Sequence, residues 1–306
     1  MRSKKKIADK WQKEGVAFGN LQQHEEAIRC FNRVLRIDPK NVDAMFGKGR
    51  ALHSLGRHEE AIICWDNVLQ IDPKYKEAWL WKGFSLRGLE LYEEALKYFD
   101  KVIESDPAGA NIWYLLYSKG LILNVLKRYE DAIKCFDEVI SSHPEQVEAW
   151  LWKGQTLHGM ERYEEAIQCY DKVIGIDPDH IDAWSNRGFA LNIMEKYEEA
   201  IQCYDKVMGF VPGDTHALSN KGLALHGLER FEEAITCYDM AIKKEPEHAG
   251  AWYIKGLALH GSERYEEAIL CYDKVIGFDP GHIGAWYGKG LALHNLKKSG
   301  QSKGQN

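Results

Sequence analysis

The sequence predicts an all-α protein in which one helical hairpin is repeated along the chain. Three residue types recur with a single period in the 306 residues. The eight prolines lie 34 residues apart, except for one interval of 37, and each is preceded by a glycine 24 residues earlier and an alanine 12 residues earlier. A fixed period of this length is the mark of a repeat architecture. We therefore expect eight repeats and part of a ninth.

Numbering each repeat so that its proline falls at position 32 gives the boundaries along the chain. The repeats span residues 8–41, 42–75, 76–109, 113–146, 147–180, 181–214, 215–248 and 249–282. Residues 283–298 match only the first helix of a repeat and are expected to cap the array. Residues 1–7 form a basic tail, and residues 299–306 form a Gly/Ser/Gln/Lys tail that we expect to be disordered. The insertion Ala110-Asn111-Ile112 should lengthen the following first helix by about one turn, or lengthen the loop before it.

Each repeat divides into two antiparallel helices, as residues 249–282 illustrate. The first half places Trp252, Gly256 and Leu259 at helical spacings. The second half carries an amphipathic helical pattern at Ala268, Ile269, Tyr272, Val275 and Ile276. Paired glutamates at the start of the second helix suit the positive end of its dipole. The proline ends the helix, because it disfavours helical geometry at the residue before it.

The repeat resembles the tetratricopeptide repeat, which has an aromatic residue at positions 4 and 24, glycine at 8, alanine at 20 and proline at 32. Position 4 holds Trp11, Trp79, Trp150, Trp184, Trp252 and Trp286, and position 24 holds Phe31, Trp65, Phe99, Phe136, Tyr170, Tyr204, Tyr238 and Tyr272. The pattern departs from the family at position 7, mostly lysine, and at position 11, mostly leucine. The resemblance covers residues 8–296. It implies a right-handed superhelical α-solenoid of helix-turn-helix hairpins.

Composition argues against several classes of protein. A net charge of −6 is the wrong sign for a dedicated nucleic-acid binder, and no run of 18 apolar residues suggests a membrane span. The basic N-terminus lacks the apolar segment of a secretion signal. We therefore expect a cytoplasmic protein with neither a nucleic-acid partner nor membrane insertion.

No motif points to catalysis, a cofactor or a metal. One cysteine falls at position 23 of every repeat except the third, which has Tyr98. Neighbouring cysteines are too far apart there for disulfides, and small packing residues are the simpler interpretation. Five histidines share position 12, namely His53, His158, His226, His260 and His294. One imidazole per repeat gives poor tetrahedral geometry for zinc. We therefore expect no enzyme and no cofactor.

The resemblance implies that the first helices line a concave groove that binds a protein or peptide partner. The positions facing that groove in the family are 2, 5, 6, 9, 12 and 13. In this chain those positions carry the candidate binding residues Trp81, Phe84, Tyr117, Trp152, Gln155, Asn186, Phe189, Asn220 and Tyr253. Exposed tryptophans are typical interaction anchors, and Trp79 and Trp150 are expected to fill the core position beside Trp81 and Trp152. The leading hypothesis is a non-catalytic scaffold.

Three alternatives stay open at this point. Trp81 and Trp152 could pack on each other instead of facing a partner, if the insertion bends the fourth repeat. The protein could self-assemble through its ends, since Trp286 and Leu293 lie on a last helix with no second helix after it. An RNA-binding array fits poorly, because the expected groove is apolar and mildly acidic. The lysine and asparagine set with which family members hold chaperone C-termini is absent.

Overall fold

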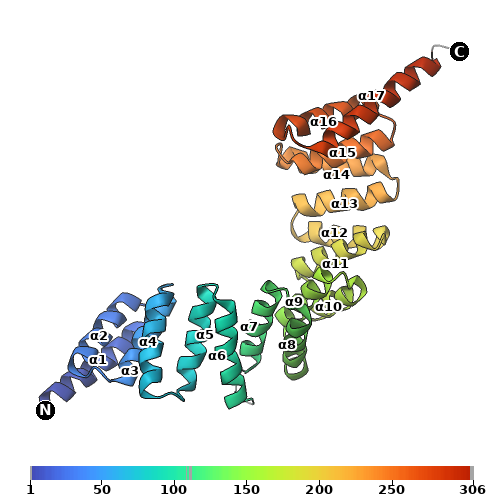
Figure 1. Ribbon diagram of the computed structural model, residues 1–306. Helices are drawn as coiled ribbons and strands as arrows, with labels where there is room; N and C mark the ends of the chain where they lie inside the picture. Colours follow the sequence, from blue (N-terminus) through green and yellow to red (C-terminus); the bar gives the residue numbers. More distant parts are fainter. Residues whose placement is uncertain (1, 108, 110–111, 304–306) are drawn as a thin grey trace. The chain divides into compact units, whose positions relative to one another are not determined.

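The computed structural model describes residues 2–107, 109 and 112–303, and over these residues it contains helices and no strand. The described chain divides into two compact halves, residues 1–144 and residues 145–306 (Figure 1). The N-terminal half contains α1 to α8 and the C-terminal half α9 to α17. Each half is a stack of helical hairpins, which confirms the predicted all-α solenoid.

Helix bounds follow the repeat numbering closely. The N-terminal half contains α1 (Arg2–Asn20), α2 (His24–Ile37), α3 (Val42–Ser54), α4 (His58–Ile71), α5 (Lys76–Gly88), α6 (Tyr92–Ser105), α7 (Ile112–Val125) and α8 (Tyr129–Ser142). The C-terminal half contains α9 (Val147–Gly159), α10 (Tyr163–Ile176), α11 (Ile181–Ile193), α12 (Tyr197–Phe210), α13 (Thr215–Gly227), α14 (Phe231–Lys244), α15 (Ala249–Gly261), α16 (Tyr265–Phe278) and α17 (Ile283–Lys303). Each second helix ends two residues before its proline, as expected.

The turn between the two helices of a repeat is a strained feature that recurs at position 15. The residue there adopts a left-handed conformation in every repeat, with φ between 57° and 61° for the non-glycine residues. Only the second repeat has a glycine, Gly56, at this position. Left-handed geometry costs an L-residue about 1–2 kcal/mol, so packing of the following helix must stabilise the turn.

The core of each hairpin is an aromatic ring packed on a glycine. The rings at position 24 are at most 2% exposed, and the alanines at position 20 are fully buried. A Cβ atom added to the position-8 glycine of any of the eight repeats would lie 2.5–2.9 Å from that ring. Glycine therefore recurs at position 8 because the ring occupies the space that a side chain would need.

The tryptophans at position 4 do not form the core, contrary to expectation. Trp79 and Trp150 are only half-buried. In the C-terminal half the Nε1 of Trp184, Trp252 and Trp286 donates to the carbonyl of the proline six residues earlier, at 2.8–2.9 Å. An indole carries a polar N–H that needs a partner, so it lies at the rim of the core and ties the first helix to the preceding turn.

The irregular segments also differ from the expectation. α1 begins at Arg2, inside the segment predicted to be a tail, and α17 runs to Lys303, inside the other predicted tail. Lysine and glutamine favour helix when nothing ends it. Of the insertion, Ala110 and Asn111 lie outside the described residues, and Ile112 adds a single residue to the start of α7.

Candidate functional site

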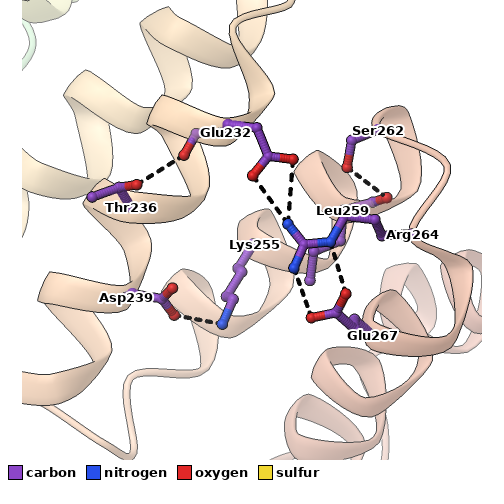
Figure 2. A network of polar contacts seen from close by, with 8 residues as sticks. All are labelled: Glu232, Thr236, Asp239, Lys255, Leu259, Ser262, Arg264 and Glu267. Carbon is purple, nitrogen blue, oxygen red and sulfur yellow. Dashed lines mark hydrogen bonds and ion pairs between the residues drawn. The ribbon is translucent and has the colours of Figure 1, made fainter.

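Charged side chains join successive helices at regular intervals. The ammonium of Lys255, at position 7 of α15, lies 2.5 Å from Oδ1 of Asp239 on the preceding helix α14 (Figure 2). The basic residue at position 7 makes the same contact in Lys82–Asp66, Lys119–Asp100, Arg187–Asp171, Lys221–Asp205 and Lys289–Asp273. In these repeats the basic residue at position 7 is therefore paired within the scaffold.

A second set of ion pairs involves the glutamates that begin each second helix. Arg264 donates to Glu267 of its own repeat at 2.7 Å and lies 3.1 Å from Glu232 of the preceding repeat (Figure 2). The Arg264 guanidinium holds the pKa of the Glu267 carboxyl below its ordinary value. The paired glutamates thus link neighbouring repeats, and acid–base catalysis is not needed to explain them.

In the N-terminal half the predicted residues belong to a continuous run of aromatic rings. Trp81 is half-buried and stacks on Trp65 with ring centroids 6.5 Å apart. Phe84, only 8% exposed, lies 6.0 Å from Trp81 and 5.1 Å from Phe99. The ring of Tyr114 bridges Phe84 and Tyr117, at 5.8 and 6.5 Å. Trp81, Phe84 and Tyr117 therefore lie on one face, with much of their surface already used in packing.

A polar group lies beneath Trp81. The imidazole of His53 lies 5.2 Å from the Trp81 ring, and its Nδ1 is 3.0 Å from the buried hydroxyl of Ser85. The same hydroxyl accepts a hydrogen bond from Nε1 of Trp65. Burial, aided by His58 and Arg87, lowers the pKa of His53 to about 4. His53 is therefore neutral at physiological pH, and it is half-buried.

In the C-terminal half the predicted binding residues are more dispersed. Trp152 and Gln155 are half-buried on α9, and Asn186 is half-buried on α11. The carbonyl of Asn220 accepts a hydrogen bond from Nδ2 of Asn192 at 3.0 Å. The ring of Tyr253 lies 4.8 Å from the imidazole of His282.

Phe189 differs from these residues because it is strongly exposed. Its ring is 43% exposed and stacks on His158, with centroids 5.3 Å apart. Leu223 and Leu291 hold the same position on α13 and α17 and are 41% and 39% exposed, with half-buried Leu257 between them on α15. Since α11, α13, α15 and α17 contact one another in that order, these four side chains form a row, which we call the position-9 stripe.

The sequence analysis did not select the three leucines of the position-9 stripe, nor Tyr114. The available signal was the run of apolar residues at position 9 in four consecutive repeats. Aromatic residues were preferred to leucine as candidate binding residues, so the leucines of the position-9 stripe were not selected.

The remaining reactive side chains are buried or isolated. All seven cysteines are buried. Burial raises the pKa of Cys135 and Cys271 to about 11, so these thiols are poor nucleophiles. Within the described residues, no group of three or more His, Cys, Asp or Glu side chains could hold a metal ion. Over the same part of the chain, no helix has the length and apolar character needed to cross a membrane.

Several solved structures are similar to this chain. The crystal structure of YrrB, described as a TPR protein with an unusual peptide-binding site, has a TM-score of 0.54 and 23% identity over 62% of this chain and 97% of that chain. The C-terminal part of a TPR repeat-containing protein from Cytophaga hutchinsonii has a TM-score of 0.69 and 16% identity, over 79% and 98% of the two chains. MamA from Desulfovibrio magneticus RS-1 has a TM-score of 0.54 and 22% identity, over 57% and 98%. These identities are low, so the similarity shows a shared fold.

Sequence comparison is more specific. The family described as tetratricopeptide repeat matches residues 13–76, 117–181 and 219–283. Two further matches with the same description cover residues 181–209 and 76–108. None of the curated proteins matches the chain. The repeat pattern, the stacked hairpins and these matches agree: the chain belongs to the tetratricopeptide repeat family, whose members are generally non-catalytic scaffolds for protein interactions.

Proposed function

We propose that this protein is a non-catalytic scaffold that binds an apolar segment of a partner protein along its first helices. The position-9 stripe carries the proposal. Three of its four side chains, Phe189, Leu223 and Leu291, are about 40% exposed. Apolar side chains exposed at the same position of neighbouring helices are typical of an interaction surface.

The surroundings of the stripe support a partner segment with few charges. In residues 181–295 the groove positions 2, 5, 6, 9, 12 and 13 hold one charged residue, Asp182, apart from histidines. An apolar surface binds apolar side chains by excluding water, whereas a charge placed there would lose its hydration. The half-buried amides of Asn186 and Asn220 flank the stripe and could hydrogen-bond the partner backbone.

The N-terminal half carries an aromatic face of its own, which is more acidic. Trp81 and Tyr117 are half-buried there, and the exposed carboxylates of Asp43 and Glu77 hold position 2 of their helices. A partner segment bound to this face would gain from a lysine or arginine beside these carboxylates. Trp81 is half-buried, so we expect it to contribute less than a fully exposed tryptophan would.

The test is a selection of 15-residue peptides from a displayed library against the full chain. The peptides that emerge should be rich in apolar residues and poor in acidic ones. Their affinities are then measured by fluorescence anisotropy with wild type and with a Phe189→Ala/Leu223→Ala double variant. We expect the double variant to bind at least about tenfold more weakly, since two exposed anchors are truncated.

The matched control is Leu270→Ala. Leu270 is 66% exposed on the second helix α16, at position 22, so it tests apolar exposure without the position-9 location. Trp81→Ala and Trp152→Ala are measured in parallel, after circular dichroism shows that each remains helical. Equal weakening by Leu270→Ala and by the double variant, or no effect of either, would refute the location of the site.

A further inference from the structure

One repeat lacks the aspartate that pairs with the basic residue of the next repeat. Position 25 holds aspartate in seven of the eight complete repeats and Asn32 in the first. The basic residue that follows Asn32 in the register is Lys48, at position 7 of α3. Over the part of the chain that the structure describes, Lys48 makes no ion pair and no hydrogen bond, and the Asn32 side chain makes no hydrogen bond. Lys48 is therefore left without the carboxylate that its equivalents hold.

The equivalent lysine in the last complete repeat shows which group Lys48 can hold. Nζ of Lys255 lies 2.5 Å from Oδ1 of Asp239 (Figure 2). Lys255 keeps this contact although Glu267 lines the same groove, because Arg264 holds the Glu267 carboxylate at 2.7 and 2.8 Å. A lysine at position 7 therefore takes a carboxylate in the presence of the glutamate at position 19.

The surroundings of Lys48 repeat this arrangement without the aspartate. The carboxylate of Glu60, at position 19, is held by Arg57 at 2.6 and 2.8 Å. Lys48 is half-buried, so part of its surface stays open to a ligand. The amide of Asn32 offers N–H donors at the register position where the later repeats have an acceptor. An ammonium and an amide N–H both favour an anionic ligand group, and the ammonium binds it by a charge-assisted hydrogen bond.

Lys48 lines a groove of about 390 Å³ where α2, α3 and α4 meet, which we call the Lys48 groove. Its apolar lining consists of Leu35, Pro39, Met45, Leu52, Ile63 and Cys64. Ile63, at position 22, is 61% exposed. Six of the eight complete repeats have a polar residue at this position, and the other aliphatic one is Leu270, which lines the equivalent groove beside Lys255. Of these two grooves, the Lys48 groove is the one whose lysine lacks its carboxylate.

We propose that the Lys48 groove binds a segment of a partner protein that carries an aspartate or glutamate beside a large apolar residue. The carboxylate of the segment takes the place of the missing aspartate and contacts Lys48. The apolar side chain lies on Ile63, where both surfaces are removed from water. Positions 4, 7 and 11 of the first helix and position 22 of the second helix form this site. It is separate from the position-9 stripe and does not depend on it.

The test is a selection of 15-residue peptides from a displayed library on the full chain, after depletion of the library on Asn32→Asp. Depletion removes peptides that bind elsewhere, because this variant is altered only beside the Lys48 groove. We expect the surviving peptides to carry an acidic residue next to an apolar one. In fluorescence anisotropy they should bind Asn32→Asp at least about fivefold more weakly than wild type, because the new carboxylate pairs with Lys48 and repels the ligand.

Matched variants test the two parts of the site. Ile63→Gln introduces the residue that the fifth and sixth repeats have at position 22, and it should weaken binding by at least about threefold. Leu270→Gln makes the same change in the groove whose lysine is paired, and it should bind like wild type. In Asp239→Asn, Lys255 loses its carboxylate beside Leu270, so a second peptide should bind per chain.

The ligand carboxylate is tested by replacing the acidic residue of each peptide with its amide. This change should remove the difference in affinity between wild type and Asn32→Asp. Asn32→Asp should be at least as stable as wild type, so weaker binding would not arise from unfolding. Failure of any peptide to survive depletion, survivors without acidic residues, or equal binding by wild type and Ile63→Gln would overturn the proposal. An undepleted selection tests the position-9 stripe, so failure of one site does not bear on the other.

Discussion

Replacing the position-8 glycine by alanine should have opposite effects on stability at Gly222 and at Gly290. Gly222 contacts the ring of Tyr238, and a Cβ added there would lie 2.5 Å from its Cε1. Gly290 has open space at the same position. Alanine is favoured over glycine in a helix by about 1 kcal/mol, and both sites share this gain.

The contact with Tyr238 decides the sign at Gly222. Ordinary contact begins near 3.4 Å, so the ring would have to move by roughly 0.9 Å, and its side chain is fully buried among core residues. Overpacking of this kind costs about 1–3 kcal/mol, and the upper part of that range applies to a rigid ring. We expect Gly222→Ala to lower the free energy of unfolding by about 1–2 kcal/mol, and Gly290→Ala to raise local stability by up to about 1 kcal/mol.

Urea unfolding monitored by circular dichroism measures the first effect. Hydrogen exchange of α13, α14 and α17 locates both effects, because a linear array unfolds in segments. A Gly222→Ala/Tyr238→Leu double variant should recover part of the loss, since the smaller side chain leaves room for the methyl group. If Gly222→Ala stabilises the protein as much as Gly290→Ala does, packing of a ring on glycine is not the reason for the glycine period.

Two further predictions concern single side chains of the N-terminal half. Because the pKa of His53 falls to about 4 in the folded protein from 6.5, the unfolded chain binds more protons between these values, and stability should fall as pH drops from 6.5 to 4. The loss of stability is at most about 3 kcal/mol, and roughly half of that after solvent screening. His53→Asn should reduce the dependence of the urea midpoint on pH between 4 and 6.5. The first repeat carries Asn32 at position 25, where the later repeats have aspartate opposite the lysine of position 7. In Asn32→Asp the new carboxylate should therefore pair with Lys48 and raise the urea midpoint by the equivalent of about 0.5 kcal/mol. This gain should shrink in 1 M salt, because salt screens the pair. An unchanged midpoint at low salt would contradict the pairing.

Much of the architecture could be predicted from the sequence, because the relevant interactions are local or repeat at a fixed spacing. Proline ends each second helix through its own backbone geometry, so the helix boundaries follow from the period. The lysine at position 7 was visible as a departure from the family pattern. Its partner, the aspartate of the preceding repeat, became evident only when the two helices were placed side by side.

The candidate site was less predictable. Trp81 and Phe189 both hold groove positions, yet Trp81 stacks on Trp65 while Phe189 is 43% exposed. The difference depends on what the neighbouring repeat places beside each ring, and residue type carries no information about that. Residue type alone therefore could not rank Trp81, Phe189 and the leucines of the position-9 stripe by exposure.

The helix ends show most clearly what tertiary structure alone decides. Leu126-Lys127 in the fourth repeat and Leu296-Lys297 in α17 are the same dipeptide at the same repeat positions. In the fourth repeat Lys127 adopts φ 59° and the chain turns into α8, whereas Lys297 stays within a helix that continues to Lys303. The sequence by itself determined the period, the hairpins and the recurring alanine and aromatic ring of each core. Whether the chain turns was decided by tertiary packing, because a left-handed lysine is unfavourable unless a second helix packs behind it and offsets the cost.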